Sequence, residues 1–267
     1  MSWIIFDVLD RLTQYSRKQE TKIIKAIASN NIAEVKKLLQ QGVDPNLKIS
    51  DRNNLPLIFS VFEKNYFTLP QGTIGDSSKT LYRIDVKQEC LRLLLEYGAD
   101  PNLRDNSGRT ALEIAILWCM PDIVKLLFVH GADPNLRDAR DLTPLMKTAI
   151  LGIKDARPIK DKLQIIMHSI DSGAEIDAIS REGKTALMYA TGNSRIEIVE
   201  LLISSGASLS IRDPQGNRAA DVIDRNVTPQ QRDYLKKILT QPQLNLIKYK
   251  YREFIPEGDR LLNSLIN

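Results

Sequence analysis

The chain is poor in the residues that carry most enzyme chemistry. Its 267 residues include two cysteines, Cys90 and Cys119, two histidines, His130 and His168, and only 6% aromatic residues. Two cysteines are too few for a disulfide framework, which favours a reducing compartment, so we expect a cytoplasmic protein. Neither histidine has a partner at the spacing of a metal motif. We therefore expect no metal, no cofactor and no enzyme activity.

Long apolar runs are also absent. No stretch approaches the ~20 residues that a membrane-spanning helix needs. The first ten residues lack the basic start and the small-residue cleavage site of a secretory signal. Hydrophobic residues make up 43% of the chain and charged residues 26%, which is ordinary for a globular protein with a large buried core.

The most informative feature is a phrase that occurs twice. The eight residues from Gly98 to Asp105 read GADPNLRD, and the same eight return from Gly131 to Asp138, 33 residues later. A fixed period of this length is typical of stacked repeats. The glycine that opens the phrase recurs as Gly42, Gly98, Gly131, Gly173 and Gly206, at intervals of 56, 33, 42 and 33 residues. The two longer intervals predict insertions near residues 65–87 and 152–162.

Each unit has the pattern of two short helices followed by a tight turn. In the third unit, Leu112, Ala115 and Ile116 share one helical face, and a second amphipathic segment follows a break at 119–121. Cys119 replaces the glycine of that break and is expected to be exposed, whereas Cys90 is expected in the core. One turn position always holds a residue that tolerates positive φ: Asn53, Gly108, Asp141, Gly183 and Gly216.

This order of helix, helix, Gly-Ala-Asp-x-Asn, turn and Thr-Pro/Ala-Leu resembles the ankyrin repeat. The resemblance implies an all-α solenoid of about six stacked helix-turn-helix units with hairpin loops over residues 21–240, capped by N- and C-terminal helices. It also implies a monomeric, non-catalytic module that binds another protein as an adaptor, scaffold or assembly factor. The family often has histidine after Thr-Pro-Leu. This chain has Glu113, Met146 and Met188 there, so the hydrogen bonds of that histidine are missing or replaced.

The two ends depart from the repeat. Residues 1–20 are expected to form a capping helix on the first repeat, and 241–267 a C-terminal extension. An alternative is that the apolar stripe of the first helix and the basic tail contact a membrane or a membrane-protein complex. The insertion near 65–87 is either functional or disordered, and the basic insertion at 152–162 is expected to be a solvated loop.

In proteins that resemble this one, partners bind the concave surface formed by hairpin tips and first helices. The corresponding positions are Asn106, Arg109, Leu117, Trp118, Arg140, Leu142, Leu151, Arg181, Lys184 and Asn193. Trp118 stands where the family usually has a polar residue, and it either anchors an apolar peptide or covers a neighbouring insertion. Nucleic acid is not favoured as a partner, because basic and aromatic residues alternate in one segment only, near the C-terminus.

Overall fold

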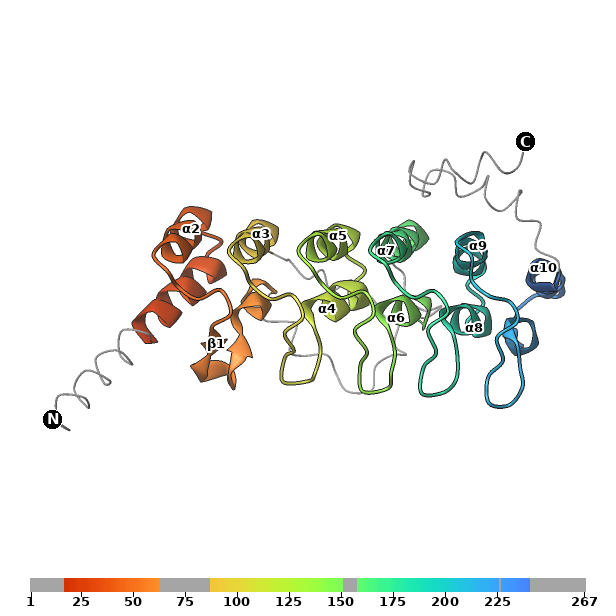
Figure 1. Ribbon diagram of the computed structural model, residues 1–267. Helices are drawn as coiled ribbons and strands as arrows, with labels where there is room; N and C mark the ends of the chain where they lie inside the picture. Colours follow the sequence, from red (N-terminus) through yellow and green to blue (C-terminus); the bar gives the residue numbers. More distant parts are fainter. Residues whose placement is uncertain (1–16, 63–86, 151–157, 226, 241–267) are drawn as a thin grey trace. The chain divides into compact units, whose positions relative to one another are not determined.

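The computed structural model describes residues 17–62, 87–150, 158–225 and 227–240, which are mostly helical (Figure 1). Residues 17–28 form a helix that crosses the boundary expected after residue 20. The other elements are α2 (Ile32–Gln40), β1 (Lys48–Ile49), η1 (Ser50–Arg52), β2 (Leu55–Pro56), η2 (Leu57–Val61), α3 (Gln88–Glu96), α4 (Ala111–Leu117), α5 (Pro121–Val129), α6 (Pro144–Ile150), α7 (Ile159–Asp171), α8 (Ala186–Gly192), α9 (Ile196–Ser204), η4 (Ala219–Val222) and α10 (Pro229–Thr240).

Four expectations fall on parts of the chain outside these ranges. They are the helix before residue 17, most of the 65–87 insertion, the segment 151–157 with Leu151, and the extension 241–267. The alternative of membrane contact depends on the first and last of these, so it stays a prediction from the sequence.

Contacts divide the chain into two compact units, Met1–Ala111 with Val129–Ala132, and Leu112–Phe128 with Asp133–Asn267. In the first unit, α2 packs on α3, and Ile49 pairs with Leu55 in a short antiparallel ladder. The 3-10 helix η2 takes the place of a first helix in its repeat, and all five of its residues are buried. Glu20, which is also buried, accepts hydrogen bonds from the backbone N–H of Ser50 at 2.7 Å and from its hydroxyl at 3.1 Å.

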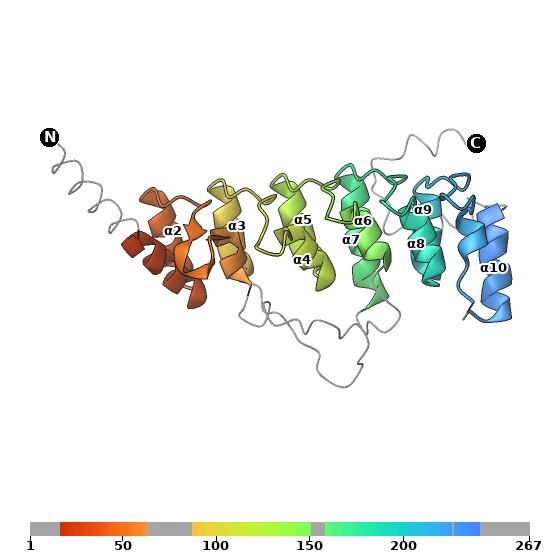
Figure 2. The same ribbon diagram turned by 90° about the horizontal axis from the view of Figure 1, so that it is seen from below.

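The second unit shows the expected pairs of antiparallel helices. The helices α5, α7 and α9 form one row, α4, α6 and α8 form a second row, and the hairpins project on the side of the second row (Figure 1). Each of α6 and α8 packs on the other and on the second helix of its own pair. Seen from below, these helices run side by side across the unit (Figure 2). The all-α ankyrin-type fold predicted from the period is therefore confirmed.

The backbone of the turns repeats as the sequence predicted. The five glycines that open the repeated phrase all have φ between +87° and +94°. The five turn positions, whether occupied by glycine, asparagine or aspartate, all have φ between +53° and +83°. A left-handed residue ends a helix at the first position and closes a tight turn at the second. One backbone shape therefore recurs in every unit.

The asparagine of the repeated phrase connects neighbouring hairpins. The side-chain amide of Asn102 donates to the carbonyl of Gly131 at 3.0 Å, and that of Asn135 donates to the carbonyl of Gly173 at 3.0 Å. Asn135 also accepts a hydrogen bond from the backbone N–H of Glu175 at 2.8 Å. Each such asparagine satisfies backbone groups of the following repeat, which fixes the spacing between them.

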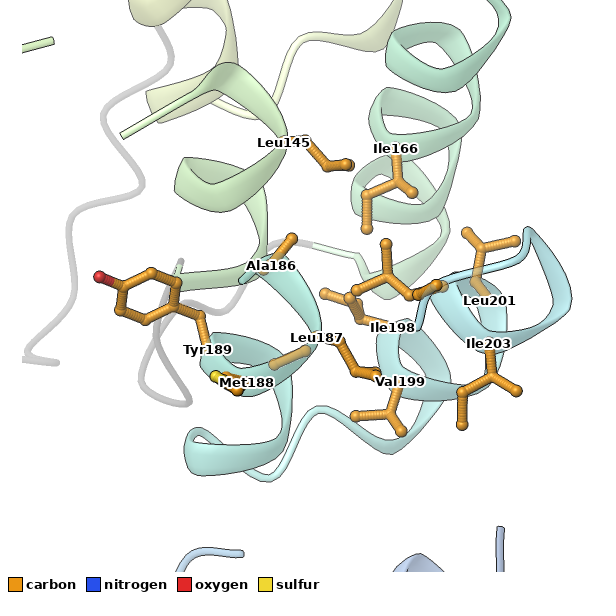
Figure 3. Close-up of a cluster of buried hydrophobic side chains, with 14 of the residues drawn as sticks. Leu145, Ile166, Ala186, Leu187, Met188, Tyr189, Ile198, Val199, Leu201 and Ile203 are labelled. Carbon is orange, nitrogen blue, oxygen red and sulfur yellow. The ribbon is translucent and has the colours of Figure 1, made fainter. Parts of the chain in front are cut away.

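A continuous hydrophobic core runs through the second unit from α6 to α10. Figure 3 shows its centre, where Leu187 of α8 lies against Ile198 and Val199 of α9. Ile198 and Val199 are 0% exposed, and Leu145 of α6 is 1% exposed. Complete burial of an aliphatic side chain of this size contributes about 1.5–3 kcal/mol. Burial shared between successive pairs is what holds the repeats together.

Two expectations about burial are wrong. Cys119 has the positive φ (+56°) expected of an inter-helix turn, but it is 6% exposed instead of lying at the surface. A thiol is small and apolar enough to remain inside such a turn. Lys162 was expected in a solvated loop and is 1% exposed. It lies in α7 four residues before the buried Ile166, so it shares the core-facing side of that helix.

Candidate functional site

The hairpin tips of the second unit place several of the predicted binding residues together. We define the hairpin surface as residues 137–142, 179–184 and 212–217, the ends of three successive hairpins. Arg140 donates to Glu182 at 3.1 Å, and Lys184 lies 3.3 Å from the same carboxylate. Arg181 lies 3.5 Å from Asp141, and its backbone N–H donates to the carbonyl of Arg140 at 3.4 Å.

The aspartates of these hairpins are used inside their own turns. One carboxylate oxygen of Asp138 accepts from the backbone N–H of Arg140 at 2.8 Å and of Leu142 at 2.9 Å. Asp213 repeats the arrangement with the N–H groups of Gln215 and Asn217, at 3.0 and 2.8 Å. Burial alone would raise the pKa of Asp138, but the N–H of Leu142, the ammonium of Lys147 and the N–H of Arg140 hold it below its usual value. Both carboxylates close their turns; the side chain of Asp138 is 21% exposed, and Asp213 is 6% exposed.

The two other acidic residues of the tips, Asp141 and Glu182, each lie beside basic neighbours. Hydrogen bonds from Arg140 and Lys184 lower the pKa of Glu182. The side chains of Arg140 and Arg181 are nevertheless 64% and 68% exposed. A guanidinium has five N–H donors, so a single carboxylate neighbour leaves most of them facing solvent.

In the first unit, the predicted residue Arg109 has a structural role. Its guanidinium contacts Asp105 through two nitrogens at 3.0 and 2.9 Å, while Asp105 also accepts from the backbone N–H groups of Ser107 and Arg109 at 2.8 Å. Asn106 stands exposed at the tip of the same hairpin. Arg109 therefore stiffens its hairpin, and of the two residues Asn106 is the more accessible to a binding partner.

The predicted apolar positions do not all lie at the surface. Leu142 is 4% exposed and belongs to the core, so its expected role as a surface contact is corrected: the left-handed turn at Asp141 directs the next side chain inward. Leu117 and Trp118 are half-buried. Asn193 follows the end of α8, where its side-chain amide donates to the carbonyl of Tyr189 at 2.7 Å.

A charged cluster at the base of the hairpins was not predicted. Lys147 of α6 lies 2.9 Å from Glu113 of α4 and 3.0 Å from Asp138. Glu113 occupies the position where the family often has histidine, so Lys147 supplies a connection between repeats that histidine would otherwise make. The next repeat has Tyr189 and Ser180 at the corresponding places, joined at 3.0 Å. Lys147 and Tyr189 stand at the same position of successive repeats, as do Asp138 and Ser180, so an alignment of the repeats could have revealed both pairs.

The described residues offer no obvious reaction centre. Within them, no three histidine, cysteine, aspartate or glutamate side chains are grouped as metal ligands. Burial raises the pKa of the Cys90 thiol, which disfavours the reactive thiolate. Burial, with Lys125 nearby, lowers the pKa of His168. In the same part of the chain, every helix is too short or too polar to cross a membrane.

Comparisons with known proteins agree with the repeat geometry. The family model for ankyrin repeats (three copies) matches residues 84–138 and 119–213. ZDHHC13 of Danio rerio, named as a palmitoyltransferase, is 25% identical over 78% of this chain and 33% of its own length. The B-cell lymphoma 3 protein homolog of Mus musculus is 25% identical over 78% of this chain and 41% of its own length. Neurogenic locus notch homolog protein 1 of Homo sapiens is 29% identical over 63% of this chain and 6% of its own length.

The chain thus spans less than half the length of these relatives. Ankyrin repeats are protein–protein interaction modules and are generally non-catalytic. The recurring turn geometry, the paired helices and the family match lead to one conclusion: this chain belongs to the ankyrin-repeat family.

Proposed function

We propose that this chain is a cytoplasmic, non-catalytic adaptor, scaffold or assembly factor that binds a partner protein through the hairpin surface and the adjoining helices α6 and α8. The observation that carries the proposal is the meeting of Arg140, Arg181 and Lys184 on neighbouring tips. Three of the positions at which related proteins bind partners thus form one surface here. Arginine is enriched among the residues that dominate binding energy.

The hairpin surface also has the rigidity that recognition needs. Tips 137–142 and 179–184 are tied to each other by the Arg181–Arg140 backbone hydrogen bond and by a 2.7 Å hydrogen bond from Arg137 to the carbonyl of Ile179. A surface that is ordered before binding loses less conformational entropy when the partner arrives. The arrangement therefore supports stable binding rather than a transient loop contact.

A bulky side chain added to the hairpin surface tests whether the partner binds there, and the same addition elsewhere in the chain serves as the control. Ala139 is exposed at a hairpin tip, and Ala33 is exposed on α2. Affinity purification with mass spectrometry should recover a partner with the wild-type chain and with Ala33→Trp. Ala139→Trp should reduce its recovery at least roughly tenfold, as obstruction of an interface centre does. Equal recovery with both variants would show that the partner binds elsewhere.

The same purification tests the two interpretations of Trp118. If Trp118 anchors the partner, Trp118→Ala should reduce recovery as strongly as Ala139→Trp does. Unchanged recovery would leave Trp118 with a role inside this chain.

A further inference from the structure

We propose that the hairpin surface recognises an acidic protein segment. Asp or Glu side chains of that segment would take the places of Glu182 and Asp141, the carboxylates of this chain that contact Arg140 and Arg181. This inference rests on the proposed function and specifies the chemistry of the partner. The argument depends on which charges of the surface face outward.

The outward charges of the hairpin surface are predominantly basic. Its basic residues are Arg137, Arg140, Arg181, Lys184 and Arg212, and its acidic residues are Asp138, Asp141, Glu182 and Asp213. Asp138 and Asp213 face inward, because each accepts backbone N–H groups of its own turn. Five basic side chains therefore stand against two outward carboxylates, which favours a partner of negative charge.

The arginines are held in position by hydrogen bonds within the chain, and those contacts leave N–H donors available to a partner. Arg137 and Arg212 each donate to a carbonyl of their own turn, at 3.4 and 2.6 Å, which anchors both side chains at the tips. Arg140 and Arg181 reach across to the neighbouring tip and stay largely exposed. Exposed ion pairs of this kind contribute little to stability, so an incoming carboxylate can exchange with Glu182 or Asp141 at small cost.

The pattern fits a protein segment better than nucleic acid. Asp141 and Glu182 lie within 3.5 Å of the cations and would repel a continuous line of phosphates. Tyr189, whose ring lies 5.8 Å from the ammonium of Lys184, is 8% exposed and offers no open face on which a base could stack. A chain with separated carboxylates can instead place each one beside an arginine, in bidentate geometry.

Binding of defined probes tests the inference with the full chain. The probes are a fluorescent peptide of alternating Glu and Ser, its counterpart with Gln in place of Glu, and a single-stranded oligouridine. Fluorescence anisotropy should show tighter binding of the acidic peptide than of the other two. Arg140→Glu/Arg181→Glu should weaken that binding roughly tenfold or more, since two attractions become repulsions. Lys36→Glu/Lys236→Glu changes the net charge equally at exposed positions of α2 and α10, and should have little effect.

A second pair of variants replaces one exposed carboxylate by an amide of nearly the same size. Glu182→Gln removes the competing internal carboxylate and should tighten peptide binding severalfold. Glu197→Gln makes the same change on the exposed side of α9 and should not. The inference fails if the Gln peptide or the oligouridine binds as tightly as the acidic peptide. It also fails if each control behaves like its matched surface variant.

Failure of this inference is distinguishable from failure of the proposed function. Loss of the captured partner in Ala139→Trp, together with no preference for acidic peptide, would leave the surface as the binding site and exclude acidic recognition. A preference for acidic peptide that survives Ala139→Trp would instead place the acidic site away from the hairpin surface.

Discussion

At the scale of single residues, the turns show how one position can be fixed by two separate constraints. Gly183 has φ +74°, and a Cβ added to it would lie 2.3 Å from Cδ of Pro214 in the next hairpin. Gly216 has φ +83° at the corresponding place, and a Cβ there would meet nothing within 4 Å. Backbone conformation alone explains glycine at 216, whereas close packing between hairpins is a further reason at 183.

This difference predicts unequal effects of the same substitution. Gly216→Ala should lower the free energy of unfolding by about 1–2 kcal/mol, the cost of a left-handed non-glycine residue. Gly183→Ala should cost about 1–3 kcal/mol more, because the methyl group meets a proline ring that cannot rotate away. Urea denaturation of the two variants measures the difference. Equal losses would mean that the hairpins separate freely.

At the scale of elements, polar contacts decide how neighbouring helices are joined. The hydroxyl of Tyr234 on α10 donates to the carboxylate of Glu200 on α9, which is 2% exposed. Burial and this hydrogen bond raise the pKa of Tyr234 to about 12. Lys147 has the corresponding role between α4 and α6, where its side chain is 18% exposed and that of Glu113 is 6% exposed. Partners of this kind are costly to remove singly, because a charge then remains buried.

Removal of Lys147 should therefore destabilise the second unit. Lys147→Met should lower the free energy of unfolding by about 2–4 kcal/mol at pH 7, and Glu113→Gln/Lys147→Met should recover part of that loss.

The pKa of Asp138 is lowered in the folded chain. The stability that Asp138 contributes is therefore present above the unfolded pKa of about 3.9 and is lost as pH falls through the folded pKa.

The part of the Lys147 effect that acts through Asp138 should accordingly shrink below about pH 4. Denaturation at several pH values, with an NMR titration of the Asp138 carboxyl, checks this. The pKa of Asp138 should rise in Lys147→Met. An unchanged pKa would show that the N–H groups of its turn alone determine it.

At the scale of the whole molecule, stability comes from contacts between successive repeats. The core of the second unit connects α6 to α10 through side chains such as Leu145, Leu187 and Ile198. In the first unit, Val35 of α2 is equally buried, at 0% exposed. Because each repeat contacts mainly its neighbours, local damage should spread by one repeat and then decline.

Two matched core substitutions test this. Ile198→Ala should cost about 2–5 kcal/mol and accelerate amide hydrogen exchange in α8 and α9, and less strongly in α6, α7 and α10. Val35→Ala should accelerate exchange around α2 and α3 instead. Uniform acceleration along the chain in either variant would indicate a single cooperative unit in place of repeat-by-repeat stability.

The sequence by itself determined the features that one repeat contains. The period between Gly98 and Gly131, the left-handed turn residues and the amphipathic helices follow from local backbone and burial rules, so the ankyrin-type fold could be predicted. The tertiary structure decided what happens between repeats. Leu142 and Lys162 became core residues, and Lys147 joined α4 and α6 through its contact with Glu113. Side chains far apart in the sequence, such as those of Arg140 and Glu182 at 42 positions, meet only when repeats pack, and a single sequence does not specify which of them pair.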